Sequence, residues 1–114
     1  MVVLYLKELK YDGKSWKVPV KVTVPQKMVI AGQLTSLFKP SAGFAVLSIE
    51  IMNVSPSSAT VEIRDGDTVV KLTPVPAGGI MRQDNIVIKN ELRVVSNVDV
   101  YVFATGEDYQ ELFA

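Results

Sequence analysis

The sequence predicts an all-β protein, namely an antiparallel β-sandwich of jelly-roll type with about eight strands and no substantial helix. Three observations predict this class. Apolar and polar residues alternate with a period of two, Asp-Gly steps separate the runs, and no segment before residue 106 has helical periodicity. Because successive side chains of a strand point to opposite faces, such alternation predicts sheets with one apolar face. We therefore expect two packed sheets.

The alternation also predicts the boundaries of the individual strands. In the run 16–24, Val18, Val20, Val22 and Val24 occupy every second position and share one face. The run 44–53 is apolar on both faces, which is typical of a central strand covered on both sides. The expected strands cover residues 2–9, 16–24, 28–37, 44–53, 59–64, 68–73, 85–89 and 91–104, the last with a break near Ser96-Asn97.

Turn residues separate these runs. Asp12-Gly13 and Asp65-Gly66 predict tight hairpins, because such turns require positive φ angles. Asn90 predicts a left-handed residue in a further tight turn. After residue 106, the segment "EDYQELFA" could form a single helical turn.

The segment "PVPAGG", residues 74–79, predicts a crossover between the two sheets. Pro74 and Pro76 lack a backbone donor and therefore end the preceding strand, while Gly78 and Gly79 permit conformations that other residues avoid. A phosphate-binding glycine loop is the alternative. It is disfavoured because no helix and no Lys-Ser/Thr pair follow the glycines.

Composition narrows the possible functions. The chain has 114 residues, which suits one domain over residues 1–114, and its 12 basic and 12 acidic residues cancel. We therefore expect neither nucleic acid nor a membrane as a partner. There is no Cys and no His, so the chain offers no disulfide, thiolate or imidazole. The N-terminal residues lack the features of a signal peptide, so we expect a cytoplasmic product.

Candidate chemical groups are few. Asp65 and Asp67 flank Gly66, but the oxygen ligands of an EF-hand loop do not follow at the required spacing. Two carboxylates on one hairpin tip are also unlike the facing pair of a glycosidase. Lys14-Ser15 and Ser48 show no catalytic spacing. We expect no catalytic residue, no cofactor and no metal, and thus no enzyme.

The order of turns and strands resembles a known family. The segments "VTVP", "VIAG", "SSATVEIRDGD", "PVPAGG", "IVIKNELRV" and "VDVYVFATGED" are similar to small β-sandwich virion structural proteins of tailed bacteriophages, over about residues 18–108. Asn90-Glu91 stands where that family carries Gly-Asp.

That resemblance implies a non-enzymatic virion structural protein, either a capsid decoration or cement protein or another capsid-associated assembly subunit. A phage tail or head-tail connector subunit is an alternative. The implied partners are other copies of the chain and the major capsid or other virion proteins, and the implied location is the virion, after synthesis in the host cytoplasm.

Aromatic residues suggest a different alternative. Tyr11 and Trp16 flank a turn, and an aromatic platform on a sandwich would suit a sugar. A carbohydrate-binding module with a glycan partner therefore stays open beside the structural role.

Interface candidates lie at both ends of the chain and on one strand face. Residues 1–10 and 106–114 are unusually apolar for termini and could act as interface arms, although they could equally dock on their own domain. Tyr101 and Phe103 form an aromatic strand face that could meet another subunit. The full set of candidates is Val2, Val3, Leu4, Tyr101, Phe103, Tyr109, Leu112 and Phe113.

Overall fold

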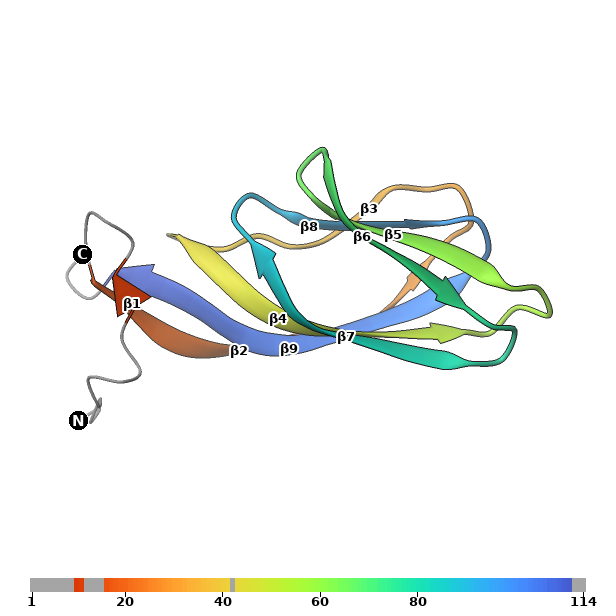
Figure 1. Ribbon diagram of the computed structural model, residues 1–114, viewed down its shortest axis with the longest axis horizontal. Coiled ribbons are helices and arrows are strands. Elements are labelled where there is room, and N and C mark those ends of the chain that lie inside the picture. Colours follow the sequence, from red (N-terminus) through yellow and green to blue (C-terminus); the bar gives the residue numbers. More distant parts are fainter. Residues whose placement is uncertain (1–9, 12–15, 42, 112–114) are drawn as a thin grey trace.

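The computed structural model describes residues 10–11, 16–41 and 43–111, which form two antiparallel β-sheets packed face to face (Figure 1). The strands are β1 (Lys10–Tyr11), β2 (Trp16–Val29), β3 (Thr35–Phe38), β4 (Phe44–Asn53), β5 (Ala59–Asp65), β6 (Thr68–Val75), β7 (Ile80–Ile88), β8 (Leu92–Ser96) and β9 (Val100–Glu111). The predicted all-β antiparallel sandwich is thereby confirmed. These residues contain no helix, and so none that could cross a membrane.

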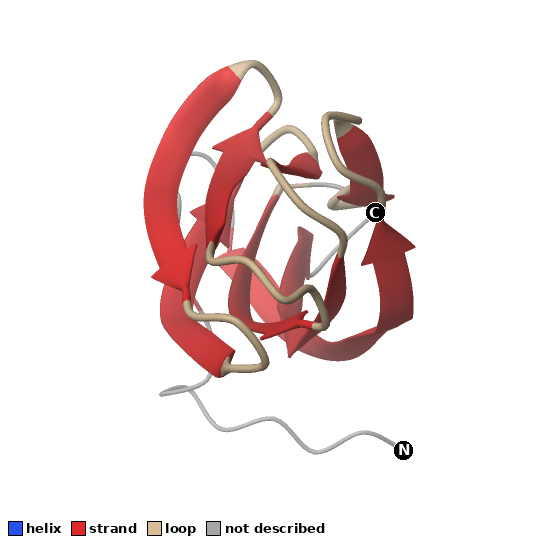
Figure 2. Cartoon of the chain, turned by 90° about the vertical axis from the view of Figure 1, so that its right-hand side faces the viewer, coloured by secondary structure: helices blue, strands red, loops and turns tan. Residues whose placement is uncertain are grey.

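The chain passes repeatedly between the two sheets. The five-stranded sheet has the order β1-β2-β9-β4-β7, and the four-stranded sheet has the order β3-β8-β5-β6. From β2 onward, only the β5–β6 connection stays within one sheet. Seen from one end of the molecule, loops run from one layer to the other (Figure 2). This connectivity is compatible with the jelly-roll type, which stays a prediction.

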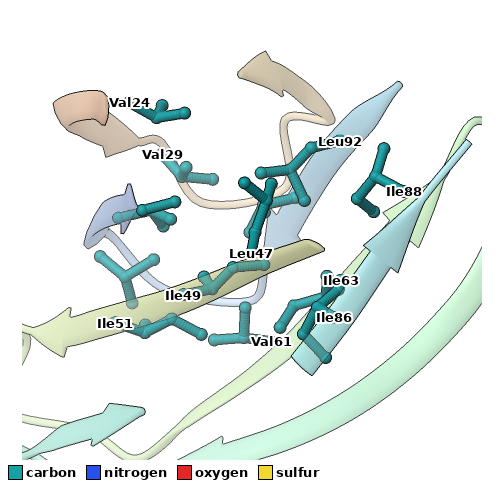
Figure 3. Close-up of a cluster of buried hydrophobic side chains, with 14 of the residues drawn as sticks. Val24, Val29, Leu47, Ile49, Ile51, Val61, Ile63, Ile86, Ile88 and Leu92 are labelled. Atoms are coloured by element: carbon teal, nitrogen blue, oxygen red, sulfur yellow. The ribbon is translucent and has the colours of Figure 1, made fainter. Parts of the chain in front are cut away.

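Aliphatic side chains from both sheets fill the space between them. Leu47, Ile49 and Ile51 enter this core from the five-stranded sheet, and Val61 and Ile63 meet them from the four-stranded sheet (Figure 3). All five are fully buried. The period-two pattern predicts these inward positions, because each of them alternates with a residue on the outer face of its strand.

Several predicted strands have different boundaries in the structure: β2 extends the run 16–24 to Val29, β6 extends the run 68–73 to Val75, and β7 begins at Ile80 where the prediction began at residue 85. The predicted strand 2–9 lies outside the described residues. The run 28–37 is wrong as a strand, because β2 continues to Val29 and a loop separates it from β3. Gly32 forms this bend with a φ of 78°, and its N–H donates to the carbonyl of Ser96 at 2.8 Å. The run 91–104 is divided into β8 and β9, which confirms the predicted break.

The C-terminal segment is a strand where a helical turn was predicted. β9 continues to Glu111 and pairs with β2 on one side and β4 on the other, up to Tyr109 opposite Phe44. Residues 106–111 of the predicted C-terminal arm are therefore part of the five-stranded sheet. Ladder hydrogen bonds on both sides outweigh the weak local preference for a helix in this segment.

The turn predictions have mixed outcomes. Asp65-Gly66 forms the predicted hairpin between β5 and β6, with Gly66 at a φ of 61°. Asn90 does not lie in a hairpin, because β7 and β8 belong to different sheets. The left-handed asparagine is instead Asn85, whose φ is 59°, at a register shift within β7. Asp12-Gly13 lies outside the described residues.

The "PVPAGG" segment leads from β6 to β7 and makes the predicted inter-sheet crossover, but Pro74 does not end the strand, because β6 continues to Val75 with Pro74 paired opposite Thr60. Gly78 takes a φ of 69° in this connection. The fully buried Asn53 secures it: Nδ2 donates to the carbonyls of Val75 and Pro76 at 3.1 and 3.3 Å. The same nitrogen donates to the carbonyl of Ser57 at 2.8 Å, so one amide joins two connections at this end of the molecule.

Candidate contact surface

Apolar side chains gather on the outer face of the five-stranded sheet, the face turned away from the core. Strand register aligns Met28 with Tyr101, Tyr101 with Met52, and Met52 with Ile80. Four adjacent strands thus contribute one row of apolar side chains. Phe103 lies two residues further along β9 on the same face. We call these five residues, Met28, Met52, Ile80, Tyr101 and Phe103, the outer patch.

Exposure separates the outer patch from the core beneath it. Ile80 is 54% exposed and both Met28 and Met52 are 39% exposed, although all three are large apolar side chains. Their strand neighbours Ile51 and Val102 are fully buried. Packing of those neighbours between the sheets turns the patch residues outward. A contiguous apolar patch on a soluble domain usually marks an interaction site.

The outer patch is hollowed and has a polar rim. Met52, Ile80, Tyr101 and Phe103 line a shallow hollow of about 290 Å³ together with Gln26 and Glu50. This arrangement, an apolar and aromatic centre beside polar groups, is typical of the core and rim of a protein–protein interface.

An ion pair lies beside the hollow. Register places Arg82 opposite Glu50, and the Arg82 Nε donates to Asp84 Oδ1 at 2.8 Å. The hydrogen bond from Arg82, followed by one from Ser48, lowers the pKa of Asp84. The same bond to Asp84 raises the pKa of Arg82. Both groups are exposed, so they mark the polar border of the patch and add little to stability.

Further along the outer face, the residues become polar. Thr23, Thr105 and Ser48 align across three strands, and Lys21 aligns with Glu107 one step beyond. The apolar row therefore lies at the end of the sheet where β4 ends and β7 begins, at the right of Figure 1, and the polar residues separate it from the paired Val46 and Val87.

The structure separates the predicted interface residues into three groups. Tyr101 and Phe103 lie on the outer patch. Tyr109 is only 5% exposed, because its ring stacks on Phe44 with centroids 4.8 Å apart, so it docks on its own domain. Five candidates lie outside the described residues, namely Val2, Val3, Leu4, Leu112 and Phe113.

Tyr109 is held by a hydrogen bond as well as by stacking. Its hydroxyl donates to Glu107 Oε2 at 2.9 Å. Burial, together with this bond to a carboxylate, raises the pKa of Tyr109 to about 12. The phenol therefore stays protonated through the neutral range.

Sequence reasoning missed Met28, Met52 and Ile80 as members of the patch. Tyr101 and Phe103 were found because they alternate with buried valines within one strand. The other three come from β2, β4 and β7, and only the register between strands aligns them with Tyr101. The one available signal was local: Met52 lies on the second apolar face of the run 44–53.

The carboxylates weighed for chemistry have structural roles. Asp65 accepts hydrogen bonds from the backbone N–H groups of Lys89, Asn90 and Glu91, at 3.0, 2.7 and 3.2 Å. Asp67 forms an exposed ion pair with Arg93. Within residues 10–11, 16–41 and 43–111, no group of acidic side chains converges as a metal site would require. The side chains of Tyr11 and Trp16, the proposed sugar platform, lie outside the described part.

Comparison with known proteins finds a solved structure with a similar fold but assigns the chain to no family. No protein-family model and no curated protein matches the chain. Among solved structures, the chain is similar to a protein of Bacillus endospore appendages, which are described as a novel family of disulfide-linked pili. The TM-score is 0.55 at 13% identity, and the match covers 91% of this chain and 97% of that one. At this identity the likeness concerns the fold.

This finding overturns the expected function as a phage capsid decoration or cement protein, because the similar structure is a bacterial appendage protein. The physical reason lies in the motifs that carried the resemblance. "PVPAGG" and the Asp65-Gly66 hairpin are devices for ending strands and crossing between sheets, which many two-sheet sandwiches need. These motifs indicate a two-sheet β-sandwich, and they do not indicate which kind of assembly the protein belongs to. The resemblance itself and the virion location stay untested.

Proposed function

We propose that this protein is a non-catalytic structural subunit that assembles with other copies of itself into an appendage or fibre. The outer patch carries this proposal, because none of the described residues covers this row of apolar side chains from four strands. Burial of such a row against a second copy would remove it from water, at about 25 cal/mol per Å² of apolar surface. The likeness of fold to a pilus protein supports an assembled state.

Any such assembly differs from the similar pili in one chemical respect. Those pili are described as disulfide-linked, whereas this chain has no cysteine. Contacts between copies of this sequence therefore contain no disulfide. Many modest contacts repeated along an assembly can still give high overall stability, because each added contact is effectively intramolecular.

The shape of the subunit suits an elongated assembly. Its principal extents are 48 × 25 × 17 Å, and the outer patch lies on the face of the five-stranded sheet, towards the end of the long axis where β4 ends and β7 begins (Figure 1). If the patch joins a different surface of the next copy, the contact is heterologous, and such contacts build an open filament where the rotation between copies does not close a ring. Residues 1–10 stay candidates for an additional arm between copies, as the sequence suggests.

Two substitutions on one strand test the proposal. Ile80→Lys places a charge in the outer patch, whereas Val87→Lys places the same charge on an exposed residue of β7 that pairs with Val46, away from the patch. We expect Ile80→Lys to weaken self-association about tenfold or more, since it replaces with a charge an isoleucine whose exposed surface the contact would bury, and burial of a whole isoleucine side chain is worth about 1.5–3 kcal/mol. Val87→Lys should leave association unchanged.

The measurement is light scattering over a concentration series, with electron microscopy of the concentrated protein. Wild-type association should persist in excess reductant, because no disulfide contributes to it. A wild-type protein that stays monomeric at every concentration, or equal loss in both variants, would contradict the proposed function.

A further inference from the structure

We propose that Met28 and Met52 form a methionine-oxidation site that converts the outer patch from an apolar to a polar surface. The inference rests on the proposed function only where it concerns assembly. Register places the two residues on either side of Tyr101, in one row across β2, β9 and β4. Both thioether side chains are 39% exposed.

Exposure distinguishes these two methionines from a third one nearby. Met81 is half-buried on β7 and packs against the core, while Met28 and Met52 face solvent. Because the chain has no cysteine, methionine thioethers are its only sulfur groups. An oxidant that reaches this surface therefore meets no competing thiol, and oxidation of methionine follows exposure.

The chemistry requires a hydroperoxide as the co-reactant. A sulfur lone pair attacks the terminal peroxide oxygen, the O–O bond breaks, and a proton transfer releases water or an alcohol. Sulfur is oxidised by two electrons to the sulfoxide, and the peroxide is reduced by the same two electrons. The product is a polar and chiral side chain in place of a flexible apolar one.

The consequence follows from the composition of the row. The side chains aligned with Met28 and Met52 are Tyr101 and Ile80, and between them they offer a single donor, the Tyr101 hydroxyl, to two sulfoxide oxygens. A sulfoxide buried without a donor carries the cost of an unsatisfied polar group. Oxidation of free subunits would thus prevent the patch from being covered, whereas a patch already covered would be protected.

Hydrogen peroxide treatment of the purified chain tests the inference. Peptide mass spectrometry should show Met28 and Met52 oxidised about tenfold faster than Met81. Self-association, measured by light scattering, should fall at least tenfold after oxidation. A Met28→Leu/Met52→Leu double variant keeps the apolar volume without sulfur, so it should associate normally after the same treatment. Met81→Leu serves as the matched control and should behave like wild type.

Two results would overturn the inference. One is equal oxidation rates at Met28, Met52 and Met81. The other is unchanged self-association of the fully oxidised wild-type protein. If the untreated protein does not associate, the proposed function is wrong, and a second assay tests the oxidation site on the monomer. The dye 8-anilinonaphthalene-1-sulfonate fluoresces when it binds exposed apolar surface, so its fluorescence measures how apolar the outer patch is. Fluorescence should fall severalfold on oxidation of wild type and hold in the double leucine variant. An equal response of both proteins refutes the oxidation site.

Discussion

The two faces of the five-stranded sheet differ sharply although the same strands build both. Ile51 and Met52 are neighbours on β4, yet Ile51 is fully buried while Met52 is 39% exposed. The inner face meets a second sheet, whereas the outer patch meets nothing among the described residues. Stability should therefore depend on the inner face, and contacts with other molecules on the outer face. Substitutions can test how completely these two properties are separated.

The largest expected effect comes from a matched pair on β4. Ile51→Ala removes fully buried methyl groups from the core and should lower the free energy of unfolding by about 3–4 kcal/mol. Met52→Ala, one residue further, should cost less than about 1 kcal/mol, because its side chain is already partly in water. Urea denaturation of both variants measures the difference. Equal losses of unfolding free energy in the two variants would show that the inner and outer faces contribute equally to stability.

A buried amide tests the inner side at the end of β4. Asn53→Ala removes the amide that donates to the carbonyls of Val75 and Pro76, the second of which keeps the N–H of Gly79 as a donor, and should cost about 2–3 kcal/mol of unfolding free energy. Asn97→Ala is the control, since that exposed side chain accepts a single bond from the N–H of Thr60. It should cost less than about 1 kcal/mol. A smaller loss for Asn53 than for Asn97 would show that the amide does not secure the crossover.

Tyr109 is an exception that sharpens the comparison, because it belongs to the outer face and is nevertheless buried. Its pKa is raised to about 12 from an ordinary value near 10, so the folded state favours the protonated phenol. This stabilisation is complete below about pH 10 and is lost as the pH rises towards 12. We expect a loss of about 2 kcal/mol across that interval.

Denaturation at several alkaline pH values measures this effect, with Tyr109→Phe as the reference. The phenylalanine variant lacks the titrating group, so its stability should fall less over the same interval. Parallel curves for the two proteins would show that burial does not shift the phenol, and that the Phe44 stack leaves it open to water.

The smallest expected effect concerns the backbone of the edge strand β7, and it involves neither the inner nor the outer face of the sheet. Asn85 has a φ of 59°, and alanine tolerates that conformation poorly, so Asn85→Ala should cost about 1 kcal/mol. Asn85→Gly should change the free energy of unfolding by less than about 0.5 kcal/mol, since glycine accepts positive φ. Thermal unfolding of the two variants checks the difference. Equal effects would imply that the bend in β7 relaxes without penalty.

The inner face is predictable from the sequence and the outer patch only in part. Val100 and Val102 alternate with Tyr101 and Phe103, so one strand suffices to assign both faces. Met28 cannot be placed beside Tyr101 in this way, because their alignment depends on the pairing of β2 with β9. No hairpin joins β2 to β9, so no turn fixes their register, and their alignment depends on the packing of the whole sandwich.

Boundaries failed where tertiary pairing overrode local preference. The segment after residue 106 has a weak helical pattern, but pairing with β2 and β4 extends β9 to Glu111. Asn90 has the turn propensity of a hairpin residue, yet the chain passes to the other sheet at that point. Neither outcome could be read from the residues themselves, because both depend on which strand lies alongside.

The carboxylate of Asp65 has a consequence for how the chain opens. Its three bonds reach backbone amides that lie 24 to 26 residues further along the chain, from Lys89 to Glu91. The side chain of Asp65 therefore links the β5–β6 hairpin to the β7–β8 connection by hydrogen bonds at the same end of the sandwich. Amide hydrogen exchange at residues 89–91 should accordingly report on the hairpin, because those amides lose protection whenever Asp65 moves away.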